Sequence, residues 1–79
     1  MDFQQIEAKT IEILKELCGV DSIFSSDKLQ EDLGLDSLGL VSMLLLIEEG
    51  FEITLNESDM NPFDLITVRD ICILLERYV

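Results

Sequence analysis

The chain has 79 residues, enough for one compact core and too few for two, so we expect a single domain over residues 1–79. Hydrophobic residues make up 48% of it, which excludes a disordered acidic tail. Five Lys and Arg against 17 Asp and Glu give a net charge of −12. Such a field repels nucleic acid and anionic membranes and attracts basic protein surfaces.

The cysteines and the N-terminus indicate the compartment. Cys18 and Cys72 are too few and too far apart for a disulfide scaffold and stand in no metal-spaced pair, so we expect free thiols. The first residues lack the basic start and apolar stretch of a signal peptide, and no apolar run approaches the length of a membrane span. We expect a cytoplasmic, monomeric protein without nucleic-acid or membrane partners.

The first predicted element is an amphipathic helix over residues 2–18, because apolar residues recur there at helical spacing. Gly19 provides its stop. Residues 20–35 break this pattern with small polar residues, while leucines are spaced to pin the segment to a core. A loop of this length in a compact domain is usually functional, and this one leads directly into Asp36 and Ser37.

A second helix is predicted over residues 38–49, with Asp36 as its N-cap and Gly50 after its end. It has two apolar faces. The core-facing set is Leu40, Met43, Leu44 and Ile47, extended by Phe51; the other set is Leu38, Val41 and Leu45, which ends near Glu48 and Glu49. A helix that is apolar all round is normally buried, but complete burial is hard to arrange in so small a domain. We therefore favour an exposed apolar patch rimmed by acids, a combination that marks interaction sites.

After the second helix, residues 51–55 alternate apolar and polar side chains and are predicted as an extended loop, since no partner strand is in sight. Asn56 can cap a short third helix that runs through Met60 and ends at Asn61-Pro62.

A last helix opens at Thr67, with Asp70 three residues after this cap, and its apolar stripe continues to Val79. The sum is an all-α bundle of four helices, three longer and one short, with a long loop between the first two.

The usual catalytic groups are missing. The chain has no His, neither Cys has an activating neighbour in sequence, and Glu48 and Glu49 diverge by about 100° on a helix. No window supplies the ligands of an EF-hand loop or a Gly-rich phosphate loop. We therefore expect no catalytic residue and no metal site.

Ser37 is the remaining candidate. A Ser at a helix start is most often a cap, but Asp36 already suits that role and leaves Ser37 free. A phosphate on a first-turn oxygen would face the positive end of the helix dipole and its unpaired N–H groups. The position therefore tolerates a phosphate-linked modification.

The order of residues around Ser37 is specific. The chain contains Leu33-Gly34-Leu35-Asp36-Ser37-Leu38, then a helix with Val41 that ends in Glu48-Glu49-Gly50-Phe51, and later Ile66-Thr67-Val68-Arg69-Asp70-Ile71. This order resembles the phosphopantetheine attachment region and the last helix of acyl carrier proteins and their peptidyl carrier relatives. Length, acidity and the long first loop also match, so the resemblance covers nearly the whole chain.

The resemblance implies that a phosphopantetheinyl transferase moves 4'-phosphopantetheine from coenzyme A onto Ser37, between Asp36 and Leu38. The thiol of the arm then carries an acyl or aminoacyl group as a thioester for fatty acid, polyketide, nonribosomal peptide or D-alanyl transfer pathways. The implied partner-binding face is Leu38, Val41, Leu45, Glu48 and Glu49. Loading and condensing enzymes with basic docking surfaces would bind to this face.

The chain departs from the fatty-acid-synthesis pattern at Gly39 and Ser42, where acids are common, and at Gly50. The partner-binding face is thus less charged than in fatty-acid-synthesis carriers, and Asp36-Ser37-Leu38-Gly39 resembles discrete carriers for D-alanine or specialised metabolites. Asp59-Met60-Asn61-Pro62-Phe63 is similar to discrete polyketide and nonribosomal peptide carriers. Three alternatives stay open. They are an aminoacyl cargo, a small acidic helical adaptor in which Ser37 is only a cap, and an enzyme that works without His.

Overall fold

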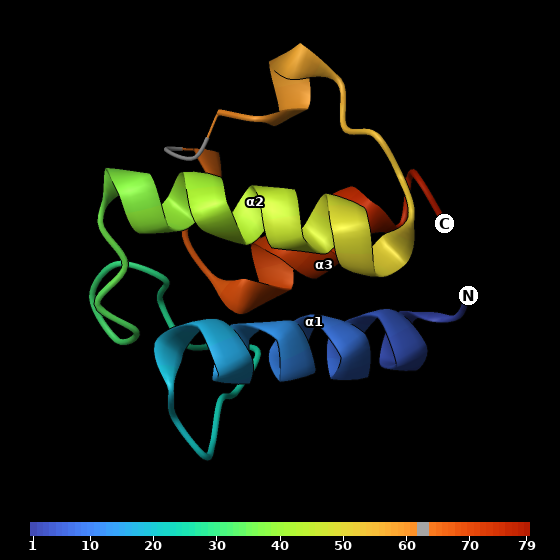
Figure 1. Cartoon of the computed structure of the whole chain (residues 1–79). Helices are drawn as coiled ribbons and strands as arrows, with labels where there is room; N and C mark the ends of the chain where they lie inside the picture. Colours follow the sequence, from blue (N-terminus) through green and yellow to red (C-terminus); the bar gives the residue numbers. More distant parts are fainter. Residues whose placement is uncertain (62–63) are drawn as a thin grey trace.

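The computed structural model describes residues 1–61 and 64–79, which form three α-helices and one turn of 3-10 helix (Figure 1). The elements are α1 (Phe3–Cys18), α2 (Ser37–Phe51), η1 (Glu57–Asp59) and α3 (Val68–Leu75). Helices α1 and α2 run in opposite directions, and α1 packs against both α2 and α3. Lys28 in the loop after α1 and Thr67 just before α3 form an isolated antiparallel β-bridge.

The predicted starts of α1 and α3 are confirmed by their caps. The Asp2 side chain accepts a hydrogen bond from the Gln5 amide, and the Thr67 side chain accepts one from the Asp70 amide. Both form capping boxes, which satisfy amide groups that a helix start leaves without partners. Helix α1 ends as predicted at Gly19, whose φ of 68° is the left-handed conformation that glycine adopts without strain.

The predicted cap of α2 is also confirmed. Asp36 Oδ1 accepts a hydrogen bond from the Gly39 amide at 2.8 Å, and the Asp36 carbonyl accepts one from the Leu40 amide at 2.9 Å. The helix therefore begins at Ser37 with its cap supplied by the preceding residue.

The predicted end of α2 at Gly50 is wrong. The helix continues through Gly50 to Phe51, and Glu52 ends it in a left-handed conformation with φ 56°. Gly50 serves packing instead, because a Cβ atom there would lie only 2.8 Å from Ile13 Cδ1 of α1.

The predicted third helix is replaced by the single turn η1, and the Asn56 side chain makes no capping hydrogen bond. The fold therefore has three α-helices and a 3-10 turn in its described part, where four helices were expected. Asn61 lies just beyond η1, whereas Pro62, the other residue expected to end that helix, lies outside the described residues, as does Phe63 of the segment that is similar to discrete carriers.

Helix α3 ends at Leu75, short of the predicted Val79, because the following residues turn to meet η1. The Tyr78 hydroxyl donates a hydrogen bond to the Asp59 carboxylate and accepts one from the Asn56 amide at 3.0 Å. Arg77 Nη2 lies 3.1 Å from Asp59 Oδ1. These contacts compete with continuation of the helix and fix η1 to the end of the chain.

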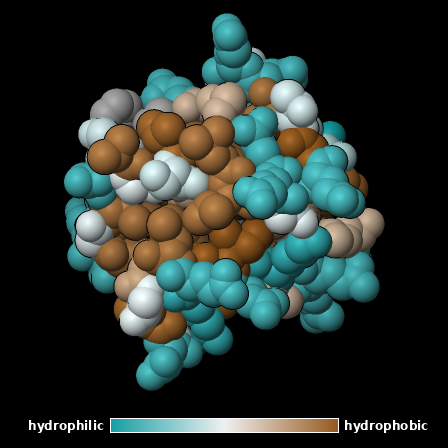
Figure 2. Space-filling model, in the orientation of Figure 1, coloured by the Kyte–Doolittle hydropathy of each residue, from teal (hydrophilic) through white to brown (hydrophobic). Residues whose placement is uncertain are grey.

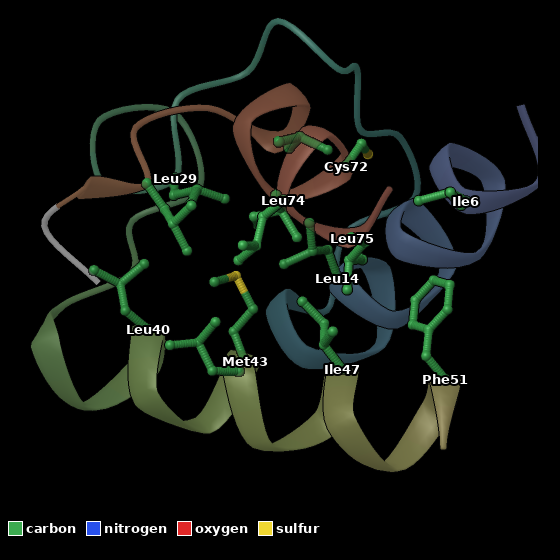
Figure 3. Close-up of a cluster of buried hydrophobic side chains, with 14 of the residues drawn as sticks. Ile6, Leu14, Leu29, Leu40, Met43, Ile47, Phe51, Cys72, Leu74 and Leu75 are labelled. Atoms are coloured by element: carbon green, nitrogen blue, oxygen red, sulfur yellow. The ribbon is translucent and has the colours of Figure 1, made fainter. Parts of the chain in front are cut away.

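The core lies between the three helices (Figure 3). The predicted inner face of α2 is buried and points toward α1 and α3; it consists of Leu40, Met43, Leu44, Ile47 and Phe51. Helix α1 contributes Ile6 and Leu14, and α3 contributes Leu74 and Leu75 (Figure 3). Burial of these side chains is the main favourable term for folding.

The long loop between α1 and α2 is fixed to the start of α3. The Leu29 amide donates to the Ile66 carbonyl at 2.8 Å, and the Val68 amide donates to the Asp27 carbonyl at 3.1 Å. The Leu29 side chain is fully buried, as its predicted pinning role requires. The loop thus delivers Asp36 and Ser37 to one end of the molecule on an ordered path (Figure 1).

The cap of α2 yields a stability prediction. Asp36→Ala should lower the free energy of unfolding by about 1 kcal/mol, whereas Asp36→Asn should lower it less, since Asn also caps helices well. Ser37→Ala should cost well under 1 kcal/mol, because Ser37 is not the cap. Urea unfolding of the variants measures these differences, and a larger loss for Ser37→Ala than for Asp36→Ala would show that Ser37 is the structural residue.

The thiols yield a prediction on reactivity. Cys72 is buried and Cys18 half-buried, and burial raises the pKa of both thiols, so little reactive thiolate is present at neutral pH. Timed alkylation with iodoacetamide followed by mass measurement should leave Cys72 unmodified in the folded protein, modify Cys18 slowly and modify both quickly in urea. Fast native alkylation of Cys72 would contradict its place in the core.

The same shifts have a consequence for stability against pH. A thiol pKa that is higher in the folded than in the unfolded chain contributes stability that is complete below the unfolded value. This contribution is lost as the pH rises through the raised folded values. Urea unfolding at increasing alkaline pH should therefore show a falling free energy of unfolding, and Cys72→Ala should reduce that fall.

Candidate functional site

Ser37 is the first residue of α2 and is exposed to solvent. In the described part of the chain, its hydroxyl group makes no hydrogen bond, and the amides of Ser37 and Leu38 have no acceptor. The Asp36 carboxylate is engaged with the Gly39 amide, as predicted. The hydroxyl group is therefore available to a reacting partner.

The surroundings of Ser37 fit a phosphate-linked group. The helix start carries the positive end of the α2 dipole, and two free amides can face a phosphate oxygen. No charged residue occurs in α2 from Ser37 to Ile47, so the helix itself adds no carboxylate near the hydroxyl group.

Gly39 explains one departure from the expected acidic pattern. A Cβ atom at this position would lie 3.1 Å from Leu35 Cδ2 and 3.3 Å from Asp36 Oδ1. A side chain would crowd both the loop and the capping carboxylate. The small residue therefore belongs to the local packing of this helix start, a role that sequence reasoning did not identify.

The second apolar face of α2 lies at the surface, as predicted. Leu38 is 75% exposed, Val41 42% and Leu45 55%, and Figure 2 shows apolar side chains gathered over this helix. Leu46 is a further exposed residue, at 39%, that the division into two stripes did not single out. Leu46 lies between the two stripes, on the side toward α1. A helical projection of every residue of α2 would have indicated this position from the sequence.

The adjacent residues Glu48 and Glu49 differ in their exposure to solvent. Glu49 is exposed, as the predicted acidic rim requires. Glu48 is partly buried, and its Oε2 accepts a hydrogen bond from the Leu55 amide at 2.9 Å. Glu48 therefore holds the loop after α2, and Glu49 is the acid of this pair that faces solvent.

Across residues 1–61 and 64–79, no three His, Cys, Asp or Glu side chains gather closely enough to hold a metal ion. None of the helices in the part of the chain that the structure describes has the length and apolar character needed to cross a membrane.

Comparison of the sequence with known proteins identifies its family. A family model for the phosphopantetheine attachment site matches residues 8–75. The acyl carrier protein of Desulforapulum autotrophicum is 40% identical over 68 residues, which cover 82% of this chain and 86% of the relative. That of Campylobacter jejuni strain RM1221 is 35% identical over 69 residues, covering 87% and 84%. That of Thermotoga maritima is 33% identical over 76 residues, covering 94% and 91%.

The family model spans the loop, the start of α2 and α3, and each of these relatives matches most of the chain. The chain therefore belongs to the acyl carrier protein family, whose members carry a covalently attached 4'-phosphopantetheine.

Proposed function

We propose that Ser37 is the attachment residue. The supporting observation is its exposed hydroxyl group, which has no hydrogen-bond partner among residues 1–61 and 64–79 and stands at a helix start that Asp36 already caps. In the transfer, the Ser37 oxygen bonds to the phosphorus next to the pantetheine unit of coenzyme A, and adenosine 3',5'-bisphosphate leaves. A base of the transferase takes the hydroxyl proton. Asp36 and Leu38 flank the residue, Asp36 by fixing the helix start and Leu38 by offering an apolar contact.

When bound, the arm supplies a thiol that holds the cargo as a thioester. The chain's own task is to keep the arm at an exposed helix end, on a domain spanning residues 1–79, in front of successive enzymes. Partner enzymes supply the bases and metals for the chemistry, so the protein acts as a non-catalytic carrier. Its free thiols suit a reducing compartment, the cytoplasm.

The partner-binding face is Leu38, Val41 and Leu45, with Glu49 at its far end. Glu48, the other acid assigned to this face, supports it indirectly through its hydrogen bond to Leu55. No Lys or Arg occurs between Leu29 and Val68, so this part of the surface attracts enzymes with basic docking surfaces from a distance. The apolar side chains then provide contact area once the partner has arrived.

The proposed cargo is an acyl group, which the names of the relatives support. The uncharged residues Gly39 and Ser42 on the face favour the enzymes of a specialised pathway over those of fatty acid synthesis. An aminoacyl cargo is the second candidate, since the same thioester chemistry would serve both.

The attachment is tested by intact-mass measurement after incubation with coenzyme A and a broad-specificity phosphopantetheinyl transferase. The wild-type chain and Ser42→Ala, a control on the same helix, should each gain one phosphopantetheinyl group. Ser37→Ala should gain none while keeping the wild-type circular dichroism spectrum. Absence of an adduct on the wild type, or an adduct on Ser37→Ala, would rule out the assignment and favour an adaptor in which Ser37 has no cofactor.

The cargo is tested on the arm-bearing protein with two kinds of loading enzyme, one that transfers acyl groups and one that transfers activated amino acids. We expect an acyl thioester that hydroxylamine releases, detected by mass. Exclusive loading with an amino acid would contradict the acyl assignment, and rapid turnover by fatty-acid-synthesis enzymes would contradict the specialised pathway.

A further inference from the structure

A shallow hollow of about 290 Å³ lies between α1 and α2, beside the exposed face. Ile13 and Glu16 line it from α1, and Leu46, Glu49 and Gly50 line it from α2. Its lining is thus apolar at three residues and acidic at two. Ile13 also packs against the core, whereas no residue of the long loop or of the start of α2 lines the hollow.

The hollow results from the way the two helices pack. A Cβ atom on Gly50 would lie 2.8 Å from Ile13 Cδ1, so the two helices approach each other closely at this glycine and the hollow lies beside that contact. Leu46 keeps 39% of its surface exposed beside this contact. An apolar side chain from another protein can therefore cover Leu46 and Ile13 at once, with the stabilisation that removal of apolar surface from water provides.

The hollow lies within reach of any enzyme that acts on Ser37. Leu46 follows Ser37 by about 14 Å along the helix axis, given a rise of about 1.5 Å per residue. An interface of ordinary size buries about 800 Å² on each partner, a patch of about 16 Å radius. Because Leu38, Val41 and Leu45 lie between the two points, a partner that covers this strip also reaches Leu46.

The charges of the hollow define the chemistry of its occupant. Glu16 and Glu49 are both exposed, and no Lys or Arg lines the hollow with them. Covering two carboxylates without a partner would be costly, so the occupant must bring cations to them.

We propose that this hollow is a docking point for the phosphopantetheinyl transferase, and that it receives an apolar side chain flanked by Lys or Arg. The proposal rests on the proposed function, since it takes the enzyme that modifies Ser37 as the partner. It adds α1, through Ile13 and Glu16, to a docking surface otherwise confined to α2.

The first test measures steady-state kinetics of arm transfer to the full chain. Leu46→Gln should lower kcat/KM about tenfold, the effect of losing one apolar anchor, through KM with kcat unchanged. The matched control is Ile73→Gln, which removes a similarly exposed apolar side chain from α3 and should leave kcat/KM within about twofold of wild type. Equal kcat/KM for Leu46→Gln and wild type overturns the proposal.

The second test isolates the charge on α1. Glu16→Gln should raise KM about threefold at low salt and weaken its dependence on salt, because one screened charge pair is lost. Glu76→Gln, an exposed acid next to α3, is the control and should leave KM and its salt dependence unchanged. The same KM for Glu16→Gln and wild type at low salt contradicts the role of α1.

The two proposals fail in different ways. If the wild-type chain gains no arm at all, the assignment of Ser37 fails. If wild type, Leu46→Gln and Glu16→Gln all gain the arm at one rate, Ser37 stands and the docking point falls. Circular dichroism of each variant separates a docking effect from loss of the fold.

Discussion

The hydrogen bond from the Gly39 amide to the Asp36 carboxylate, 2.8 Å long, is the interaction on which the rest of the structure depends. It sets the first residue of α2, and the helical period then fixes which side chains enter the core and which face solvent. Leu40 is buried and Leu38 exposed because of that phase. The same bond occupies the usual capping side chain and leaves the Ser37 hydroxyl group free.

The surface combines two forces with different ranges. Acidic side chains act over roughly 8 to 10 Å in physiological salt and attract basic surfaces. Apolar side chains on α2 act only in contact, where their area is removed from water. The segment from Ser37 to Ile47 carries no charge, so contact on the helix after Ser37 is apolar, while Glu49 and Glu16 lie further along.

Local signals made much of this fold predictable, and tertiary contacts account for the rest. Asp36 and Thr67 act as the caps that their residue types favour, and the two faces of α2 follow from helical spacing. Gly50 was misread because its packing against Ile13 is a contact between distant residues. Asn56 does not cap a helix because its segment is held by Tyr78, a partner that no local pattern reveals.

The central claim is that Ser37 alone carries the arm, because the cap by Asp36 leaves it as a free hydroxyl group on a fixed helix start. The most direct measurement is fragmentation mass spectrometry of peptides from the modified wild-type protein, which locates the phosphopantetheinyl group on one residue. The account predicts the group on Ser37 in every modified peptide. A modified peptide that carries the group on another serine, such as Ser42 on the same helix, would contradict it.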